Sequence, residues 1–469
     1  MYRSVFGFLL PAVLLFEAGC RSTDIQPAAR AALPVARVAS SEPARGAGAE
    51  ATPREPQGTL TLSAAAALAL LHNPDLKVFP YAMRVAEAQV LQVRLLPNPE
   101  LEIEIEEVGG GGDRSGFDAA ETTIQLGQLI ELGGKRTKRA AVASLQRELV
   151  QWEYESARLD TMRAVAGAFV ELLAAQDRLA LAEDQLKLSR QACTAVVQRI
   201  EAGKDSPVDE LRAGVVVSES RMERRRAEAA LATARQQLAA TWGARKATFE
   251  KVVGDLYQVS RPPPVERAAE TLAENPDVAR WATEERARRA ALRLEKARAR
   301  PDVTISGGMQ RFEETDDSAV VFGLAVPLPL FDRNQGGIER ATANLGRTRQ
   351  EAEAARIKAR AALSRAVHAL AAAYDQVNIL QDEVLPKAQQ AFEAAQRGYR
   401  EGKFDYLYVL DAQRTLFETR ARLVDTAETY QQARADVGRL TGRNLDAAAQ
   451  PEPADAADKQ SAQEDSHEE

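Results

Sequence analysis

The sequence has few of the side chains on which most catalytic and metal sites depend. Its 469 residues include only three histidines and two cysteines. His72, His368 and His467 are far apart, and no Cys or His stands at metal-ligand spacing. The Gly109–Gly112 run lacks the Lys-Ser/Thr of a phosphate-binding loop and does not open a helix. The sequence therefore predicts a protein that is not an enzyme and that has no cofactor and no metal site.

Aromatic residues are also scarce. They make up 5% of the chain, whereas charged residues make up 28%. A compact enzyme buries more aromatic side chains than this, while long helices packed on one another are rich in Ala, Leu, Glu and Arg. The net charge of -7, with no clustered basic stripe, argues against nucleic acid as a partner.

The first 20 residues have the features of an export signal. Arg3 precedes an apolar run from Val5 to Phe16, which is too short to cross a bilayer as a permanent helix. Cys20 follows directly, as in bacterial lipoprotein signals, in which that cysteine becomes the acylated N-terminus and anchors the chain in lipid. Glu17 stands where an aliphatic residue is usual, so a plain cleaved signal with an incidental cysteine is the alternative.

Two further segments lack hydrophobic periodicity. Residues 21–58 are rich in Ala, Pro and Arg and are predicted to be a flexible tether, and residues 446–469 are predicted to be a disordered acidic tail. Cys193, the other cysteine, has no disulfide partner if Cys20 is acylated, and we interpret it as a small packing residue.

The sequence between these ends contains two similar halves. His-Asn-Pro-Asp at 72–75 returns as Glu-Asn-Pro-Asp at 274–277, and Pro-Glu-Leu at 99–101 returns as Pro-Asp-Val at 301–303. The separation of about 200 residues is too long for a solenoid, so it indicates duplication of one large unit. Each unit is expected to run helix, two strands, very long helix, tight turn, helix. The predicted repeats span residues 59–258 and 259–445.

Each repeat contains a segment that predicts a very long helix. No proline occurs from Gly134 to Ser206, and apolar residues recur there at alternating four- and three-residue spacing. About 65–70 helical residues would extend on the order of 100 Å. The second copy, from Gly337 to Glu401, carries Pro386, which should kink or locally unwind the helix.

Both long helices are predicted to end at a sharp turn. Gly203 can supply a left-handed C-cap, and Ser206 with Asp209 has the spacing of a capping box at the next helix. In the second repeat Gly402 and Asp405 are expected to take the same parts. These turns predict hairpins of antiparallel helices.

Four segments alternate between polar and apolar residues, as strands with two different faces do. In the first of them Glu102, Glu104 and Glu106 oppose Leu101, Ile103 and Ile105. A soluble sheet with one buried face gives the same pattern, but the export signal, the long helices and the segment lengths favour membrane strands. Four strands leave open edges that a bilayer does not tolerate, so the barrel interpretation predicts an oligomer. The predicted strands span about 100–108, 121–132, 301–311 and 319–329.

From residue 59 to residue 443 the sequence resembles the TolC family of outer membrane factors. The motifs that carry the resemblance are LTLSAAAALALLHNPDL, LLPNPELEIEIE, IELGGKR, EAGKDSPVDELRA and EGKFDYLYVLDAQ. The Asn-Pro-Glu-Leu strand, the Gly-rich loop and QLIELGGKR are most similar to the CzcC-like branch, which serves heavy-metal cation efflux.

The resemblance implies a mainly α fold with a small β part, located in the bacterial outer membrane with its helices in the periplasm. It implies a homotrimer with long antiparallel helical hairpins in an α-barrel and four strands per chain in a 12-stranded transmembrane β-barrel. The implied partners are a periplasmic adaptor and an inner-membrane pump of the resistance-nodulation-division type. The hairpin tips that would meet the adaptor are Ala202, Gly203, Lys204, Asp205, Glu401, Gly402, Lys403 and Phe404.

Within this interpretation Glu102, Glu104 and Glu106 would form an acidic ring in the lumen that favours cations. The alternative is that they are only the solvated face of a strand. Multidrug efflux or type I secretion by the same family is a second possible function. A periplasmic coiled-coil scaffold lipoprotein without a pore is a rival of another class.

Overall fold

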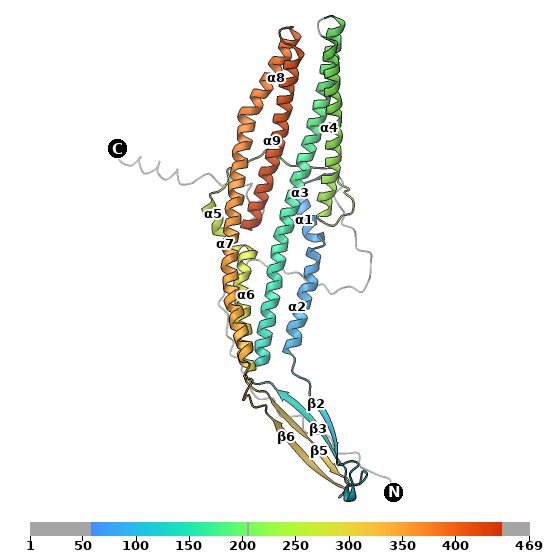
Figure 1. Ribbon diagram of the computed structural model, residues 1–469, viewed down its shortest axis with the longest axis vertical. Helices are drawn as coiled ribbons and strands as arrows, with labels where there is room; N and C mark the ends of the chain where they lie inside the picture. Colours follow the sequence, from blue (N-terminus) through green and yellow to red (C-terminus); the bar gives the residue numbers. More distant parts are fainter. Residues whose placement is uncertain (1–57, 204–205, 443–469) are drawn as a thin grey trace, which may run out of the picture. The chain divides into compact units, whose positions relative to one another are not determined.

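The computed structural model describes residues 58–203 and 206–442, which form long helices and one four-stranded sheet (Figure 1). The predictions for the signal and Cys20, for nearly all of the tether, for Lys204 and Asp205, and for the acidic tail lie outside the described residues.

The first repeat has the expected order of elements, with its first helix divided at Asn73. A short parallel pair, β1 with β4, joins the start of this repeat to the segment after its last helix, and the sequence did not predict it. The elements are β1 (Thr59–Leu60), α1 (Leu62–His72), η1 (Leu76–Val78), α2 (Phe79–Arg94), β2 (Glu100–Glu106), η2 (Gly112–Arg114), β3 (Glu121–Ile130), α3 (Lys135–Glu201), α4 (Pro207–Ala240) and β4 (Lys251–Val252).

The second repeat follows the same order. Its last predicted strand is shorter than expected, because Pro327 and Pro329 cannot donate to a strand ladder. The elements are α5 (Val265–Glu270), η3 (Thr271–Glu274), α6 (Pro276–Arg298), β5 (Val303–Phe312), β6 (Asp317–Ala325), α7 (Gln335–Ile379), η4 (Leu380–Val384), α8 (Leu385–Arg400) and α9 (Tyr406–Thr441).

The long helices of the two repeats differ in one respect. Helix α3 runs for 67 residues without a break. In the second repeat the five-residue π-helical turn η4 separates α7 from α8, directly before Pro386. Proline has no N–H to donate, and its ring clashes with the carbonyl four residues earlier, so a wider turn accommodates it. The local unwinding predicted at Pro386 is confirmed.

The strands and the helices that continue them are arranged in the same order. The sheet is antiparallel with the order β2-β3-β5-β6. Helix α2 packs on α3, α3 on α6 and α6 on α7. Since α2 leads into β2, β3 into α3, α6 into β5 and β6 into α7, each strand continues into its own helix. The result is one layer in which, among the described residues, β2 and β6 are the edge strands and α2 and α7 each pack on a single helix of the layer.

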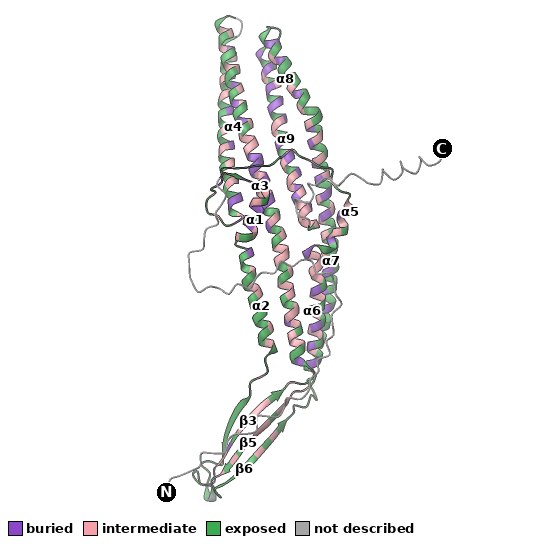
Figure 2. Cartoon of the chain, turned by 180° about the vertical axis from the view of Figure 1, so that it is seen from behind, coloured by how far each residue is buried: buried purple, intermediate pink, exposed green. Residues whose placement is uncertain are grey.

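The main hydrophobic core lies between the two hairpins and the segments that join them. It includes the fully buried Trp242, Tyr430, Leu172, Leu238 and Leu363. Buried residues follow α3, α7 and α9, whereas α2 has none (Figure 2). Across residues 58–203 and 206–442, none of the helices combines the length and apolarity needed to cross a membrane.

The repeated Asn-Pro-Asp motif joins the start of each repeat to its last helix. The Asn73 side chain accepts from the backbone N–H of Asp75 and donates to the carbonyl of Thr241 at 2.8 Å. Asn275 likewise accepts from Asp277 N–H, and it donates to the carbonyl of Leu440 at 3.0 Å. One amide side chain thus caps one helix end and satisfies a carbonyl at another.

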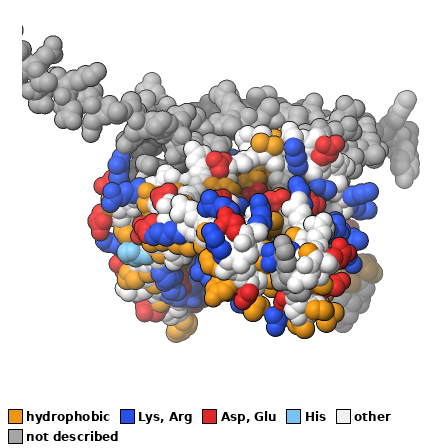
Figure 3. Space-filling model, turned by 90° about the horizontal axis from the view of Figure 1, so that it is seen from above, with side chains coloured by type: hydrophobic (Ala, Val, Ile, Leu, Met, Phe, Trp, Pro, Cys, Tyr) orange, Lys and Arg blue, Asp and Glu red, His pale blue; other side chains and the backbone are white. Residues whose placement is uncertain are grey.

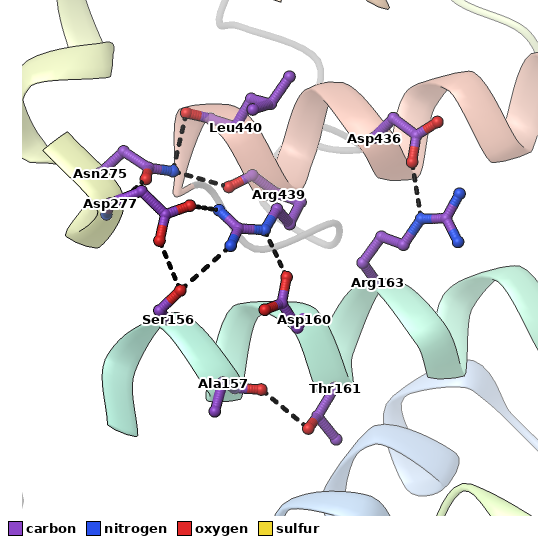
Figure 4. A network of polar contacts seen from close by, with 10 residues as sticks. All are labelled: Ser156, Ala157, Asp160, Thr161, Arg163, Asn275, Asp277, Asp436, Arg439 and Leu440. Carbon is purple, nitrogen blue, oxygen red and sulfur yellow. Dashed lines mark hydrogen bonds and ion pairs between the residues drawn. The ribbon is translucent and has the colours of Figure 1, made fainter. Parts of the chain in front are cut away.

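The second repeat adds an ionic network around Asn275 (Figure 4). The Arg439 guanidinium donates to Asp160 at 2.7 Å and forms an ion pair of 2.7 Å with Asp277. Burial lowers the pKa of Arg439, but Asp160 and Asp277 outweigh burial and raise it overall. A second pair of reversed polarity, Arg163 with Asp436 at 2.7 Å, lies one turn further along α3 and α9. These contacts fix the end of α9 against α3 and α6.

Candidate functional site

One face of the sheet is aliphatic and exposed. Cross-strand partners share a face. The registers pair Leu101 with Leu126 and Ile103 with Ile124, and on its other side Ile124 pairs with Met309. An exposed apolar surface of this kind marks a partner or a lipid contact. Its large members, all exposed in the isolated chain, are Leu101, Ile103, Ile105, Ile124, Leu126, Ile305, Met309, Val320, Phe322 and Leu324.

The opposite face of the sheet carries mainly polar and small residues, with Leu129, Phe312 and Val321 as apolar exceptions. The Gln125 amide donates to the Glu102 carboxylate at 2.7 Å, and Gln310 donates to Glu121 at 2.7 Å. Glu102, Glu104 and Glu106 all lie on this face, as the alternation predicts. The two faces therefore differ in polarity over most of the sheet.

The first hairpin tip is a left-handed turn with one side-chain cap. Gly203 has a φ of 67°, and its N–H donates to the Ile200 carbonyl at 2.8 Å. Ser206 accepts from Val208 N–H at 3.3 Å and is the predicted N-cap. The Asp209 carboxylate accepts from Arg212 at 3.4 Å.

The second tip has both hydrogen bonds of a Schellman motif. Gly402, with a φ of 75°, donates to the Tyr399 carbonyl at 3.0 Å, and Lys403 N–H donates to the Gly398 carbonyl at 2.8 Å. Asp405 occupies the N-cap position, but its side chain makes no capping hydrogen bond, so its predicted capping role is wrong. At the same turn, the Lys403 ammonium forms an ion pair of 2.6 Å with the Glu401 carboxylate.

Aromatic packing fixes the second tip further. The Phe404 ring lies over Gly398, where an added Cβ would approach the ring to 2.2 Å. The centre of the Phe404 ring is 5.5 Å from the centre of the Tyr408 ring. Phe404 remains 44% exposed. This tip therefore presents a partly exposed aromatic side chain on a hydrogen-bonded turn.

The two tips are joined below the turns. The Arg199 guanidinium of α3 lies 4.4 Å from the centre of the Tyr399 ring and donates to the Tyr399 carbonyl at 3.0 Å. Tyr399 and Tyr406 belong to a shared apolar cluster beside which Cys193 packs as a partly buried free thiol. Burial raises the pKa of Tyr406 to about 12, with contributions from Cys193 and Asp209.

Basic and acidic side chains are interspersed on the face of the molecule seen from above (Figure 3).

A partly exposed ionic cluster halfway along α3 was missed at the sequence level. Arg178 donates to Asp425 and Glu428 of α9, both at 2.5 Å. Beside it, burial raises the pKa of Asp177, although a hydrogen bond with Tyr257 lowers it. Burial also raises the pKa of Tyr257. The partners are more than 70 residues apart in the sequence, and no local pattern signals them.

The acidic residues do not gather into a metal-binding group. Within the part of the chain that the structure describes, no three His, Cys, Asp or Glu side chains are placed to hold one ion. The geometry consists of a two-faced sheet, a layer with open edges and two structured hairpin tips.

The fold, two similar units of strands followed by a long helical hairpin, is that of outer membrane channel proteins. The chain belongs to the outer membrane efflux protein family, whose model matches residues 65–244 and 268–443. The two matched segments correspond to the two repeats, and the family resemblance inferred from the motifs is confirmed.

Characterised relatives belong to metal-resistance systems. The chain is 37% identical to the cobalt-zinc-cadmium resistance protein CzcC of Cupriavidus metallidurans, over 83% of this chain and 92% of that protein. It is 28% identical to the nickel-cobalt-cadmium resistance protein NccC of Alcaligenes xylosoxydans xylosoxydans, over 64% of this chain and 68% of that protein.

Solved structures share the fold. The chain is similar to CusC, described for its folding and transmembrane channel formation, with a TM-score of 0.68, 19% identity and coverage of 82% of this chain and 92% of that one. It is also similar to the outer membrane protein VceC of Vibrio cholerae, with a TM-score of 0.69, 20% identity and coverage of 82% and 96%.

Proposed function

We propose that this chain is the outer-membrane duct of a tripartite efflux system that exports heavy-metal cations and catalyses no reaction. The observation that carries the proposal is the 37% identity to a cobalt-zinc-cadmium resistance protein across 92% of that protein's length. The substrate class follows from this relative, and the duct follows from the family and the two-faced sheet.

The layer with open edges supports assembly into a ring. An unpaired strand edge is not tolerated in a bilayer, and barrels begin at about eight strands. Three chains with four strands each would close a 12-stranded barrel, with the aliphatic face toward lipid and the face of Glu102 toward an aqueous lumen. The long helices would continue the ring into the periplasm as an α-barrel.

In that lumen Glu102, Glu104 and Glu106, repeated by symmetry, would attract cations. Replacing all three by Gln keeps the hydrogen-bonding shape and removes the charge. We expect a lower cation-to-anion selectivity in planar bilayers with unchanged trimer yield. Unchanged selectivity would mean that these residues are only a solvated face.

The hairpin tips are the surfaces proposed to dock a periplasmic adaptor of an inner-membrane resistance-nodulation-division pump. Gly203 and Gly402 need positive φ, and the N–H of each donates a hydrogen bond, so proline fits neither. Gly203→Pro or Gly402→Pro should abolish efflux while oligomers remain in the membrane. Normal metal tolerance in both variants would contradict docking at the tips.

A deletion strain tests the substrate class. We expect it to become sensitive to cobalt, zinc or cadmium while its sensitivity to dyes and antibiotics changes little. Sensitivity to drugs alone would favour a multidrug duct, and a secretion defect alone would favour type I secretion.

Membrane extraction separates the duct from a scaffold lipoprotein. A Cys20→Ala variant with an ordinary signal removes the acylation site as a confounding anchor. We expect it to stay with outer membranes through carbonate and to need detergent. Release as a soluble monomer would contradict the duct.

A further inference from the structure

Glutamate–arginine ion pairs cross every junction of the layer formed by α2, α3, α6 and α7. The α3–α6 junction has a second, longer pair, Glu153 with Arg280 at 3.9 Å. The other three, one at each junction, use consecutive residues of α3 and of α6. The pairs are Glu87 with Arg147 at 3.2 Å, Glu148 with Arg286, and Glu285 with Arg349 at 2.7 Å.

These pairs lie on the same face of the layer. Arg147 and Glu148 are consecutive in α3, so their side chains diverge by about 100° toward α2 and α6. Helix α6 runs in the opposite direction, and its consecutive Glu285 and Arg286 have the reverse order. A reversed helix with a reversed order presents its two charges on the same face as α3 does.

The pairs also share one polarity. In the order α2, α3, α6, α7 the glutamate always belongs to the earlier helix and the arginine to the next one. Hydrogen bonds from Arg349 and Arg289 lower the pKa of the Glu285 carboxyl, so its charged form is favoured in this position. Continued past the edges, the pattern requires a glutamate on the open side of α7 and an arginine on the open side of α2.

Both residues are present at the required positions. Glu353 follows Arg349 by one turn, rotated about 40° away from α6, and Arg84 precedes Glu87 by three residues, rotated about 60° away from α3. Arg84 lies 6.0 Å from the centre of the Tyr81 ring, and no carboxylate of the described residues pairs with it. Glu353 forms an ion pair of 3.5 Å with Arg356 of the same helix.

Apolar side chains accompany these charges along both edges. On α2, Tyr81 and Leu91 flank Arg84 on the same side and are 68% and 65% exposed. Helix α2 has no buried residue in the isolated chain. On α7, Ile357 follows Glu353 by one turn and is 62% exposed. Such edges suit a neighbouring helix of the same layer, with an apolar seam and opposite charges.

We propose that Arg84 of one copy pairs with Glu353 of the next copy and closes a circumferential belt of glutamate–arginine pairs. The inference rests on the proposed function, in which copies of this chain assemble side by side in a ring. The belt fixes the vertical register between copies, because a shift by one helical turn would place Arg84 opposite Gln350 or Ile357 instead.

Disulfide trapping tests the pairing in the full chain. In a Cys193→Ala background, Arg84→Cys with Glu353→Cys should give intermolecular disulfides in isolated membranes on mild oxidation. The matched control is Arg84→Cys with Glu351→Cys, because Glu351 is also exposed but lies on the opposite side of α7. We expect several-fold more cross-linked chain for the first pair, and an equal or larger yield for the control overturns the belt.

A charge exchange tests the electrostatic part. Arg84→Glu and Glu353→Arg should each lower the temperature at which the detergent-purified oligomer dissociates, and the double exchange should restore it. Additive losses in the double variant overturn the pairing. A purified wild-type chain with the native mass of a monomer contradicts the ring itself, whereas an intact oligomer without cross-linking contradicts only the belt.

Discussion

The two repeats share their backbone devices and differ in the side chains that connect them to the rest of the chain. Each has an Asn that caps one helix and donates to a carbonyl at the end of another, and each turns its hairpin at a glycine with positive φ. The second repeat alone has the Arg439 network and the π-helical turn at Pro386. The two repeats are thus alike in what the backbone requires and differ in the side-chain contacts that join them.

The largest expected effect comes from removing the shared device. Asn275→Ala removes one cap and two hydrogen bonds to Arg439 and Leu440 from a residue only 2% exposed. We expect a loss of about 3 kcal/mol in the free energy of unfolding in detergent. Asn73→Ala is the matched variant. It also removes three hydrogen bonds, from the N–H groups of Asp75 and Leu76 and to the Thr241 carbonyl, but from a residue that is 9% exposed, and it should cost about 2 kcal/mol. A larger loss for Asn73→Ala would contradict the ranking.

The next variant targets what only the second repeat has. Arg439→Leu leaves the carboxylates of Asp160 and Asp277 without their shared cation. Because both carboxylates are about half exposed, we expect a loss of about 1–2 kcal/mol, measured by denaturant unfolding. Exchanging Asp436 for Asn, which breaks the more exposed pair with Arg163, should cost less.

Pro386→Ala would make the second long helix more like the first. The substitution restores an N–H and removes the clash with the carbonyl of Asp382, so η4 can return to α-helical hydrogen bonding. We expect slower amide hydrogen exchange in residues 380–384 and a gain of about 1 kcal/mol in stability. Exchange in the uninterrupted α3 should not change, and faster exchange at 380–384 would contradict the account.

The smallest effect concerns a carboxylate of the first repeat whose burial is only partly compensated. Burial raises the pKa of Asp177 above 3.8, so the folded state binds its proton more tightly than the unfolded state. The resulting stabilisation is full below the unfolded pKa and is lost as pH rises through the folded pKa. Asp177→Asn should therefore raise the melting temperature at pH 7, with no gain near pH 3. An equal gain at both pH values would point to packing instead.

Local patterns in the sequence were sufficient for the elements but not for their connections. Alternation around Glu102 and Ile103 predicted both faces of the sheet. Gly203 and Pro386 acted through their backbone geometry, and Ser206 acted through its capping hydroxyl. Asp405 failed as a cap, since occupying the position does not require its side chain to bond.

Contacts between distant segments had no local signal. Arg439 lies more than 160 residues from Asp277 and more than 270 from Asp160, and any of the many arginines could have filled its role. The ion pairs that cross the layer, from Glu87 to Arg349, are likewise visible only once the order of the helices is known. Such pairs depend on the packing of the whole layer, which one sequence does not specify.

The absence of buried residues in α2 has a thermodynamic consequence. In the proposed ring, the burial that holds this helix in place comes from a neighbouring chain, so part of the folding free energy is a binding free energy and obeys mass action. The melting temperature of the purified protein should then rise with its concentration. A newly exported chain would acquire its full resistance to proteases only when it meets its partners.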